Sequence, residues 1–232
     1  MRQLFFLFVL FLLMPVSLQA QEERVIIPVD WKEVKEVAEK DPERIKGLVA
    51  RLSANNIDTT MTWKERILAY YGQSFLTAKT ELIEGRGLDQ LFNEKKYEKC
   101  LTDARELLKK NPVSLKALCN AAFAISKMVK DSTNHYDVSI DEGQVYYNRM
   151  IRILNTIAKT GDGTEERPFY VTAVSDEYMF MRYYLELWEI GKQSLTGTCD
   201  VFELKETSKY YYRPEIFFEI TRVLEIERGL FE

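Results

Sequence analysis

Five carboxylates fall within sixteen consecutive positions of the C-terminal half and are the first side chains to consider for chemistry. A glycoside hydrolase places two carboxyl groups on opposite sides of a sugar, so such a pair would make this protein a small hydrolase. The competing interpretation is structural, because acids in a turn are solvated and acids at a helix start complement the helix dipole. The five residues are Asp162, Glu165, Glu166, Asp176 and Glu177.

Other catalytic arrangements lack the residues that they need. His135 is the single histidine and lies in the polar stretch 131–142, where a solvated side chain is the simpler interpretation. A metalloprotease helix with paired histidines is therefore excluded. Asp131 and Glu142 have the outer spacing of a calcium loop, but His135 and Tyr136 stand where that loop needs an oxygen ligand and glycine. We expect no catalytic residue, no metal site and no cofactor, and hence no enzyme.

A turn with the sequence Asp-Gly-Thr at residues 162–164 is the best candidate for binding. Its glycine is expected to take a positive φ, and exposed N–H groups in such a turn can hold a carboxylate or hydroxyl. Nearby tyrosines would add aromatic faces, in a pocket between the helical part and a small sheet. The alternative is a turn that only reverses the chain. The predicted ligand or partner contacts are Asp162, Gly163, Thr164, Tyr178, Tyr211 and Tyr212.

The first two thirds of the chain are predicted to be helical, and these helices must support the candidate residues of the C-terminal part. Capping signals at Asp30, Asp41-Pro42 and Thr62 predict three helix starts. Apolar residues at helical spacing between Tyr97 and Leu108 predict an amphipathic helix that ends before Pro112, and a second apolar helix follows at once. A helix, a short turn and a further helix in this arrangement resemble a tetratricopeptide hairpin, although no clean third copy is present.

The pattern changes to a strand period after residue 160. FYVTAV, CDVFELKE and RPEIFFEIT are rich in β-branched and aromatic residues, and helical spacing follows the first and the last of them. The predicted order is strand, helix, strand, strand, helix. We therefore expect an α+β fold, mainly α, in which tetratricopeptide-like hairpins carry a small C-terminal β-sheet. One domain would span 21–232, helical over 25–160 and mixed over 161–232.

The N-terminal sequence MRQLFFLFVLFLLMPVSLQAQ has the form of a signal peptide over residues 1–20. Its apolar run is short for a membrane span, although an uncleaved anchor is the alternative interpretation. We expect export to the periplasm or the outer membrane surface, with no transmembrane segment after cleavage. The formal net charge of −4 argues against a nucleic-acid partner.

Three cysteines, Cys100, Cys119 and Cys199, are too few and too widely spaced for a zinc site or a disulfide scaffold. Buried thiols on helical faces are the simplest interpretation of Cys100 and Cys119. A bridge between these two residues in an oxidising compartment is the alternative.

Several segments together resemble a known family. LAYYGQSF, the hairpin around Pro112, GDGTEERPFYVTAVSDEY and EIFFEITRV resemble small exported Bacteroidetes proteins with a domain of unknown function (4919). The resemblance covers roughly residues 25–231 and implies no activity. Our hypothesis is a non-enzymatic interaction or scaffold protein of the bacterial envelope, with a protein partner. The alternatives are a small hydrolase that uses the acidic cluster, and a carbohydrate- or peptide-binding module built on the tyrosines.

Overall fold

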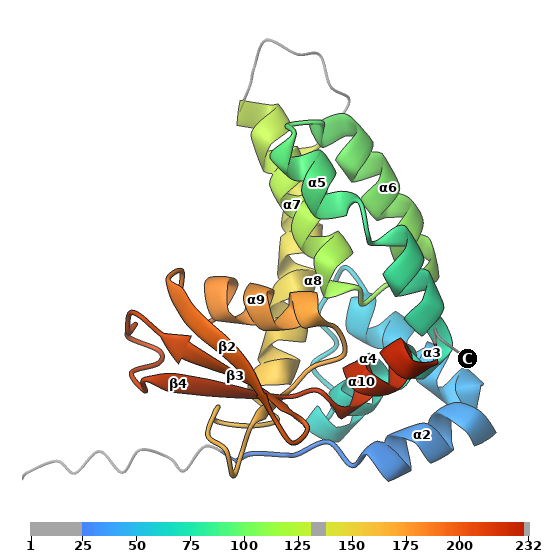
Figure 1. Ribbon diagram of the computed structural model, residues 1–232. Coiled ribbons are helices and arrows are strands. Elements are labelled where there is room, and N and C mark those ends of the chain that lie inside the picture. The colour runs from blue at the N-terminus through green and yellow to red at the C-terminus, as the bar shows by residue number, and fades with distance from the viewer. Residues whose placement is uncertain (1–24, 131–137, 230–232) are drawn as a thin grey trace, which may run out of the picture.

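The computed structural model describes residues 25–130 and 138–229. It shows a mainly helical α+β fold with a small mixed sheet (Figure 1). The helices from α5 (Leu88–Asn93) to α8 (Ile140–Ala158) stand upright, and the sheet and α9 (Val174–Tyr183) lie at their base (Figure 1). The expected signal peptide and His135 lie outside the described residues. Among the described helices, none has the length and apolar character needed to cross a membrane.

The N-terminal helices begin where the capping signals predict. Asp30 accepts hydrogen bonds from two backbone N–H groups at the start of α2 (Trp31–Lys40), and Asp41 caps α3 (Pro42–Ser53). Thr62 and Glu65 cap each other's backbone at the start of α4 (Trp63–Glu84). The helix α4 runs straight through Gly72, where a Cβ atom would lie 2.5 Å from Ile45 Cδ1. Gly72 therefore allows α3 and α4 to pack closely.

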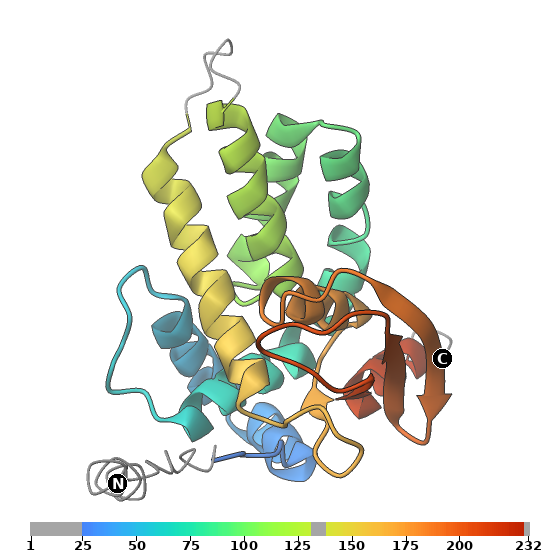
Figure 2. The ribbon, with the colours of Figure 1, turned by 90° about the vertical axis from the view of Figure 1, so that its left-hand side faces the viewer.

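The upright helices are α5 (Leu88–Asn93), α6 (Tyr97–Lys110), α7 (Leu115–Lys130) and α8 (Ile140–Ala158). The predicted apolar stripe of α6 is buried, including Leu101 and Leu108. The helix α7 packs against both α6 and α8, and Figure 2 shows α7 and α8 side by side. Their assignment to tetratricopeptide repeats stays a prediction.

The sheet is built from four strands in the order β1-β4-β3-β2. The short β1 (Phe169–Tyr170) pairs parallel to β4 (Glu215–Glu219). Antiparallel pairs join β4 to β3 (Cys199–Leu204) and β3 to β2 (Ile190–Thr196). The helix α9 (Val174–Tyr183) follows β1, and α10 (Thr221–Arg228) follows β4. Of the four strands in the described part of the chain, β2, an exposed edge strand, was not predicted.

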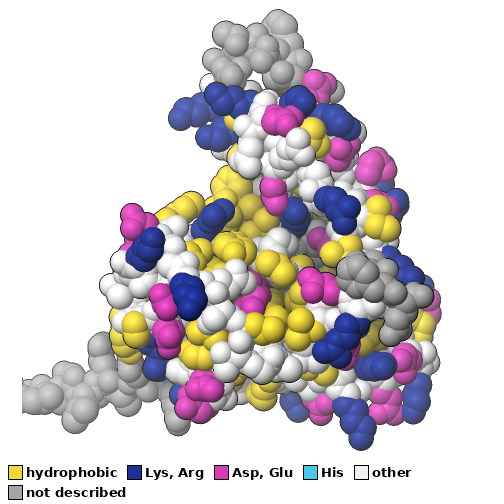
Figure 3. Space-filling view, viewed as in Figure 1, with side chains coloured by type: hydrophobic (Ala, Val, Ile, Leu, Met, Phe, Trp, Pro, Cys, Tyr) yellow, Lys and Arg dark blue, Asp and Glu magenta, His cyan; other side chains and the backbone are white. Residues whose placement is uncertain are grey.

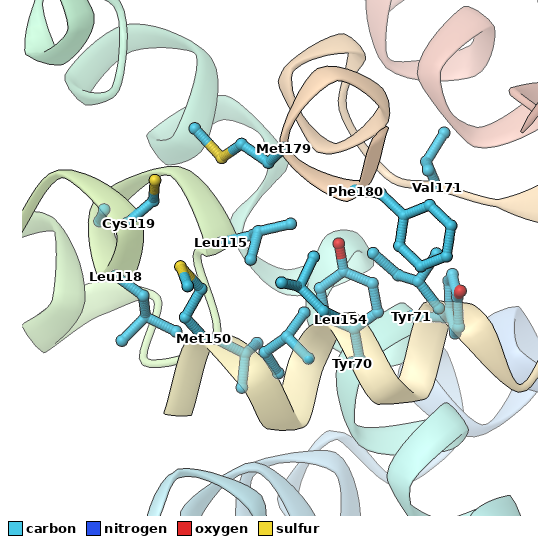
Figure 4. Close-up of a cluster of buried hydrophobic side chains, with 14 of the residues drawn as sticks. Tyr70, Tyr71, Leu115, Leu118, Cys119, Met150, Leu154, Val171, Met179 and Phe180 are labelled. Carbon is cyan, nitrogen blue, oxygen red and sulfur yellow. The ribbon is translucent and has the colours of Figure 1, made fainter. Parts of the chain in front are cut away.

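One continuous core joins the helices to the sheet. Side chains of α4, α7, α8 and α9 meet there, among them Tyr71, Leu154 and Phe180 (Figure 4). On the sheet side, the rings of Phe180 and Phe218 lie 6.1 Å apart, edge to face. Two long-range hydrogen bonds fix the same junction, from Tyr71 Oη to the Tyr170 carbonyl (2.8 Å) and from Trp31 Nε1 to Glu219 Oε2 (2.8 Å). The C-terminal part is therefore anchored on α2 and α4.

Candidate functional site

The turn after α8 pairs its polar groups within itself. The N–H groups of Asp162 and Gly163 donate to the Arg167 carbonyl at 2.9 and 3.0 Å. The N–H and the hydroxyl of Thr164 donate to Asp162 Oδ1, and the Arg167 guanidinium lies 2.6 Å from Asp162 Oδ2. Three successive N–H groups that the sequence analysis offered to a ligand are thus used by the turn.

Tyr211 holds this turn against β4. Its hydroxyl lies 2.9 Å from the carbonyl oxygen of Gly163 and 2.8 Å from that of Glu215, and its side chain is buried. Gly163 has a φ of +79°, as predicted, and a Cβ atom there would lie 2.8 Å from Tyr211 Oη and from the ring of Phe169. These contacts give the turn a rigid packing role.

The other two predicted tyrosines lie elsewhere. Tyr178 lines a hollow between α5, α7 and α9, and its hydroxyl donates to Gln193 Oε1 at 3.0 Å. Tyr212 is 80% exposed, and Tyr210 is exposed as well, so the tyrosine run at residues 210–212 is only partly buried. The structure therefore brings Tyr211 to the 162–164 turn and leaves Tyr178 and Tyr212 in other surroundings. Whether any of these residues contacts a partner stays a prediction.

A cleft with a volume of about 350 Å³ opens between α4, the start of α7, the start of α9 and α10. Figure 3 shows hydrophobic side chains gathered on this hollowed face, with acidic side chains among them. We call it the Glu81 cleft. Its polar lining residues are Tyr70, Gln73, Ser74, Thr77, Glu81, Arg86, Asn111, Ser114, Lys116, Thr172, Ser175, Asp176 and Glu227. Its other lining residues are Ala78, Leu82, Gly85, Val113, Leu115, Ala173, Val174, Val223 and Ile226.

The carboxyl group of Glu81 is fixed by neutral donors. Ser114 Oγ donates to Glu81 Oε1 at 2.7 Å, and Asn111 Nδ2 donates to Glu81 Oε2 at 2.8 Å. Burial raises the pKa of Glu81, and the nearby charge of Asp176 raises it further, whereas the two hydrogen bonds and Lys116 act in the opposite direction. A carboxyl group held without a cationic partner in a cleft is available to a cation from outside.

Two carbonyl oxygens of this cleft have no hydrogen-bond partner in the structure. Gln73 and Asn111 are 5% and 7% exposed, and Gln73 Oε1 and Asn111 Oδ1 are both buried and unpaired. An unpaired buried polar atom costs about 1–3 kcal/mol, so each such atom in a native fold needs an explanation. Both residues line the Glu81 cleft, where a ligand that donates hydrogen bonds would satisfy them.

Asp176 differs from Glu81 because one oxygen of its carboxylate already accepts four hydrogen bonds from the fold. Its Oδ2 accepts from Tyr70 Oη at 2.7 Å, from the N–H and hydroxyl of Thr172 and from the N–H of Ala173. Burial raises the pKa of Asp176, and these donors oppose that rise. Asp176 therefore caps the start of α9 and places negative potential in the cleft.

The basic side chains at the cleft are Lys116 and Arg86. Lys116 Nζ lies 2.9 Å from Asp89 Oδ2, so its charge is directed to a carboxylate that does not line the cleft. Arg86 is exposed, and so is the acidic Glu227 on α10. The interior of the cleft is therefore rich in hydrogen-bond acceptors. Of its charged donors, Lys116 is paired with Asp89 and Arg86 is exposed at the rim.

The acidic cluster considered from sequence does not converge on one site. Glu165 and Glu166 are exposed, Asp162 pairs with Arg167, and only Asp176 lines the Glu81 cleft. Glu177 is fully buried on the next position of α9, and its oxygens accept no hydrogen bond. Burial first, and then the neighbouring Asp200, raise the pKa of Glu177 to about 9. Glu177 is therefore protonated at neutral pH.

The cysteines lie away from the cleft lining. Cys100 and Cys119 are both free and buried, and burial raises the pKa of the Cys100 thiol to about 11. The described residues contain no group of three His, Cys, Asp or Glu side chains that is placed to hold a metal ion.

Glu81 and Gln73 were not predicted from the sequence as site residues. They lie on α4, Asn111 ends α6, and Asp176 lies on α9, so the cleft joins parts of the chain that are far apart. A signal was nevertheless present. The segment LAYYGQSF, residues 68–75, supplies Tyr70, Gln73 and Ser74 to the cleft, and the segment that ends in VSDEY supplies Asp176.

Comparison with protein families gives one match. Residues 34–228 match the model of a family described as Domain of unknown function (DUF4919). No curated protein and no solved structure matches this chain significantly.

Proposed function

Since this chain belongs to the family with domain of unknown function DUF4919, whose description assigns no activity, we propose a function from the Glu81 cleft itself. We propose that the protein is a non-enzymatic binding protein that holds a projecting side chain of a partner protein in this cleft. The partner would lie in the bacterial envelope, as the signal-peptide form of residues 1–20 suggests.

The unpaired oxygens of Gln73 and Asn111 carry the proposal. Native folds rarely leave such atoms buried without a partner, and the cleft already holds a carboxyl group beside them. A concave site with apolar walls and a few convergent polar groups is the usual form of a binding pocket. The fold bears the cost of these groups in the free state, which an arriving donor would relieve.

A small hydrolase is the second candidate. Its supporting observation is that Glu81 and Asp176, two carboxyl groups whose pKa burial raises, line one cleft. Paired carboxyl groups of this kind serve glycoside hydrolysis as acid and base. Binding is favoured because Asp176 Oδ2 accepts four hydrogen bonds from the fold, which makes it a poor nucleophile or base.

Site-specific photo-crosslinking in the cells that make the protein tests the proposal. A benzoylphenylalanine at Leu82 places the reactive group in the cleft, and the same residue at Ile83, which is 70% exposed and does not line the cleft, is the matched control on α4. We expect a discrete protein adduct from position 82 and none from position 83. Equal adducts from both positions, or no adduct from position 82, would overturn the proposal. A glycan or peptide that the purified protein turns over, and that Glu81→Gln does not, would favour the hydrolase.

A further inference from the structure

We infer that the Glu81 cleft recognises an ammonium group on an aliphatic stem, as at the end of a lysine side chain; this inference rests on the binding function proposed above. It follows from what the cleft offers and from what it lacks. The interior offers hydrogen-bond acceptors in the form of Glu81, Gln73 Oε1 and Asn111 Oδ1. A ligand that brings only acceptors, such as a carboxylate or phosphate, would leave these atoms unpaired and would face the Glu81 charge.

An ammonium matches these acceptors in number and in charge. It carries three N–H donors and no acceptor, and the residues that line the cleft include one carboxyl group without a cationic partner and two amides whose buried carbonyl oxygens have no partner. Asp176, whose carboxylate caps α9, also lines the cleft and adds negative potential. Lys116 does not satisfy this site, because its ammonium lies on Asp89 at 2.9 Å. A charge-assisted hydrogen bond to Glu81 would be stronger than the two neutral ones that hold it now.

The walls of the cleft suit the stem of such a ligand. Ala78 and Leu82 on α4 face the cleft together with Val223 and Ile226 on α10. Lysine buries its methylene groups along apolar surface while its charged end seeks polar partners. Among the described residues that line the cleft, Tyr70 is the one aromatic side chain, and its hydroxyl is bound to Asp176. The cleft therefore lacks the exposed ring on which a sugar would stack.

A calorimetric titration of the purified mature chain tests this inference with simple probes. The probes are n-butylammonium, neutral n-butanol of similar size, and n-butylguanidinium as a model of arginine. We expect n-butylammonium to bind at least about tenfold more tightly than n-butanol, because only the cation satisfies a buried carboxylate. Equal affinities for these two probes would overturn the inference, and so would tighter binding of n-butylguanidinium.

Three variants test which residues cause the preference for n-butylammonium over n-butanol. Glu81→Gln should abolish the preference for n-butylammonium, whereas Glu84→Gln, one turn along α4 and paired with Lys110 at 2.6 Å, should keep it. Gln73→Leu removes an acceptor that the fold does not use and gives a second, independent test should Glu81→Gln fail to fold. A preference that survives Gln73→Leu and Glu81→Gln would contradict the site. Loss of the ammonium preference with a persistent adduct at position 82 would remove only this inference, whereas loss of the adduct would remove the binding function.

Discussion

The turn at residues 162–167 and the Glu81 cleft both gather polar groups, but they differ in how these groups are paired. In the turn, Asp162 receives two hydrogen bonds from Thr164 and a guanidinium from Arg167, and Tyr211 covers Gly163. In the cleft, Gln73 and Asn111 keep buried oxygens without partners. The turn is therefore a structural element, whereas the cleft has the unpaired polar groups of a binding site.

The difference shows which polar groups could gain hydrogen bonds from a ligand. A fully paired network stabilises the fold and leaves little for a ligand to gain. An unpaired buried acceptor costs stability, so a ligand that pairs with it recovers that cost on binding. Substitutions should therefore separate the two regions: those in the turn should lower stability, and those in the cleft should lower binding while stability holds.

Gly163→Ala should give the largest loss of stability. The new Cβ atom would meet Tyr211 and Phe169 at 2.8 Å, at a φ of +79°, so we expect a loss of about 3–5 kcal/mol in unfolding free energy. Gly197→Ala is the matched control, because Gly197 also has a positive φ (+61°) but nothing within 4 Å of its Cβ position. It should lose only about 1–2 kcal/mol. Equal losses in urea denaturation would show that the turn is not tightly packed.

Glu177→Gln should change how stability depends on pH. The pKa of Glu177 is about 9 in the fold against an ordinary 4.5, so the folded state keeps a proton that the unfolded chain releases above pH 4.5. Stability from this group is complete below pH 4.5 and is lost as pH rises toward 9, by about 1.4 kcal/mol per unit at most. Between pH 6 and 8, the wild type should therefore lose about 2–3 kcal/mol more than Glu177→Gln.

Denaturant unfolding at the two pH values measures this slope. Glu203→Gln on β3 is the control, because Glu203 is exposed and its removal should leave the slope unchanged. A wild-type slope that Glu177→Gln also retains would mean that Glu177 is ionised in the fold. Such a result would place a buried charge beside the cleft instead of a protonated carboxyl group.

Tyr211→Phe should have a smaller effect of about 0.5–1.5 kcal/mol. The variant removes the hydroxyl that lies against two carbonyl oxygens but keeps the packing of the ring, and the Gly163 carbonyl still accepts from the Phe217 N–H at 3.0 Å. Thermal melts report the loss, and n-butylammonium affinity should stay as in the wild type. A fall in that affinity at unchanged stability would move the binding site to the turn.

Gln73→Leu should have the smallest effect on stability, within about 0.5 kcal/mol or slightly favourable, because it removes an unpaired acceptor. Asn120→Leu is the contrasting variant. Asn120 is equally buried, but its amide donates to Asp89 Oδ1 at 2.9 Å and to the Lys116 carbonyl at 3.0 Å. It should cost about 1–3 kcal/mol. A comparable cost for Gln73→Leu would show that the fold uses this amide.

Local signals in the sequence predicted most of the fold. The caps at Asp41 and Thr62, and the breaker Pro112, act within a few residues of themselves, so helix boundaries follow from them. The strand β2, with the sequence IGKQSLT, was missed because it is an exposed edge strand that lacks β-branched and aromatic alternation.

The candidate site depends on long-range packing and was not predicted from the sequence. The predicted pocket lies between the helical part and the small sheet, beside the 162–164 turn, whereas the Glu81 cleft is lined by no residue of that turn or of a described strand. Its key residues, Gln73, Asn111 and Asp176, come together only once α4, α6 and α9 have packed. No spacing rule links residues so far apart, so unpaired acceptors become visible only in the folded chain.

The pKa of the Glu81 carboxyl group, followed by carbon NMR during a pH titration, tests the central claim most directly. Burial should hold this pKa above the ordinary value of 4.5 in the free protein. Saturating n-butylammonium should lower it, because a bound cation stabilises the carboxylate, and n-butanol should not. The affinity for the ammonium should accordingly rise as pH increases through that pKa. A Glu81 pKa that n-butylammonium leaves unchanged would contradict the account.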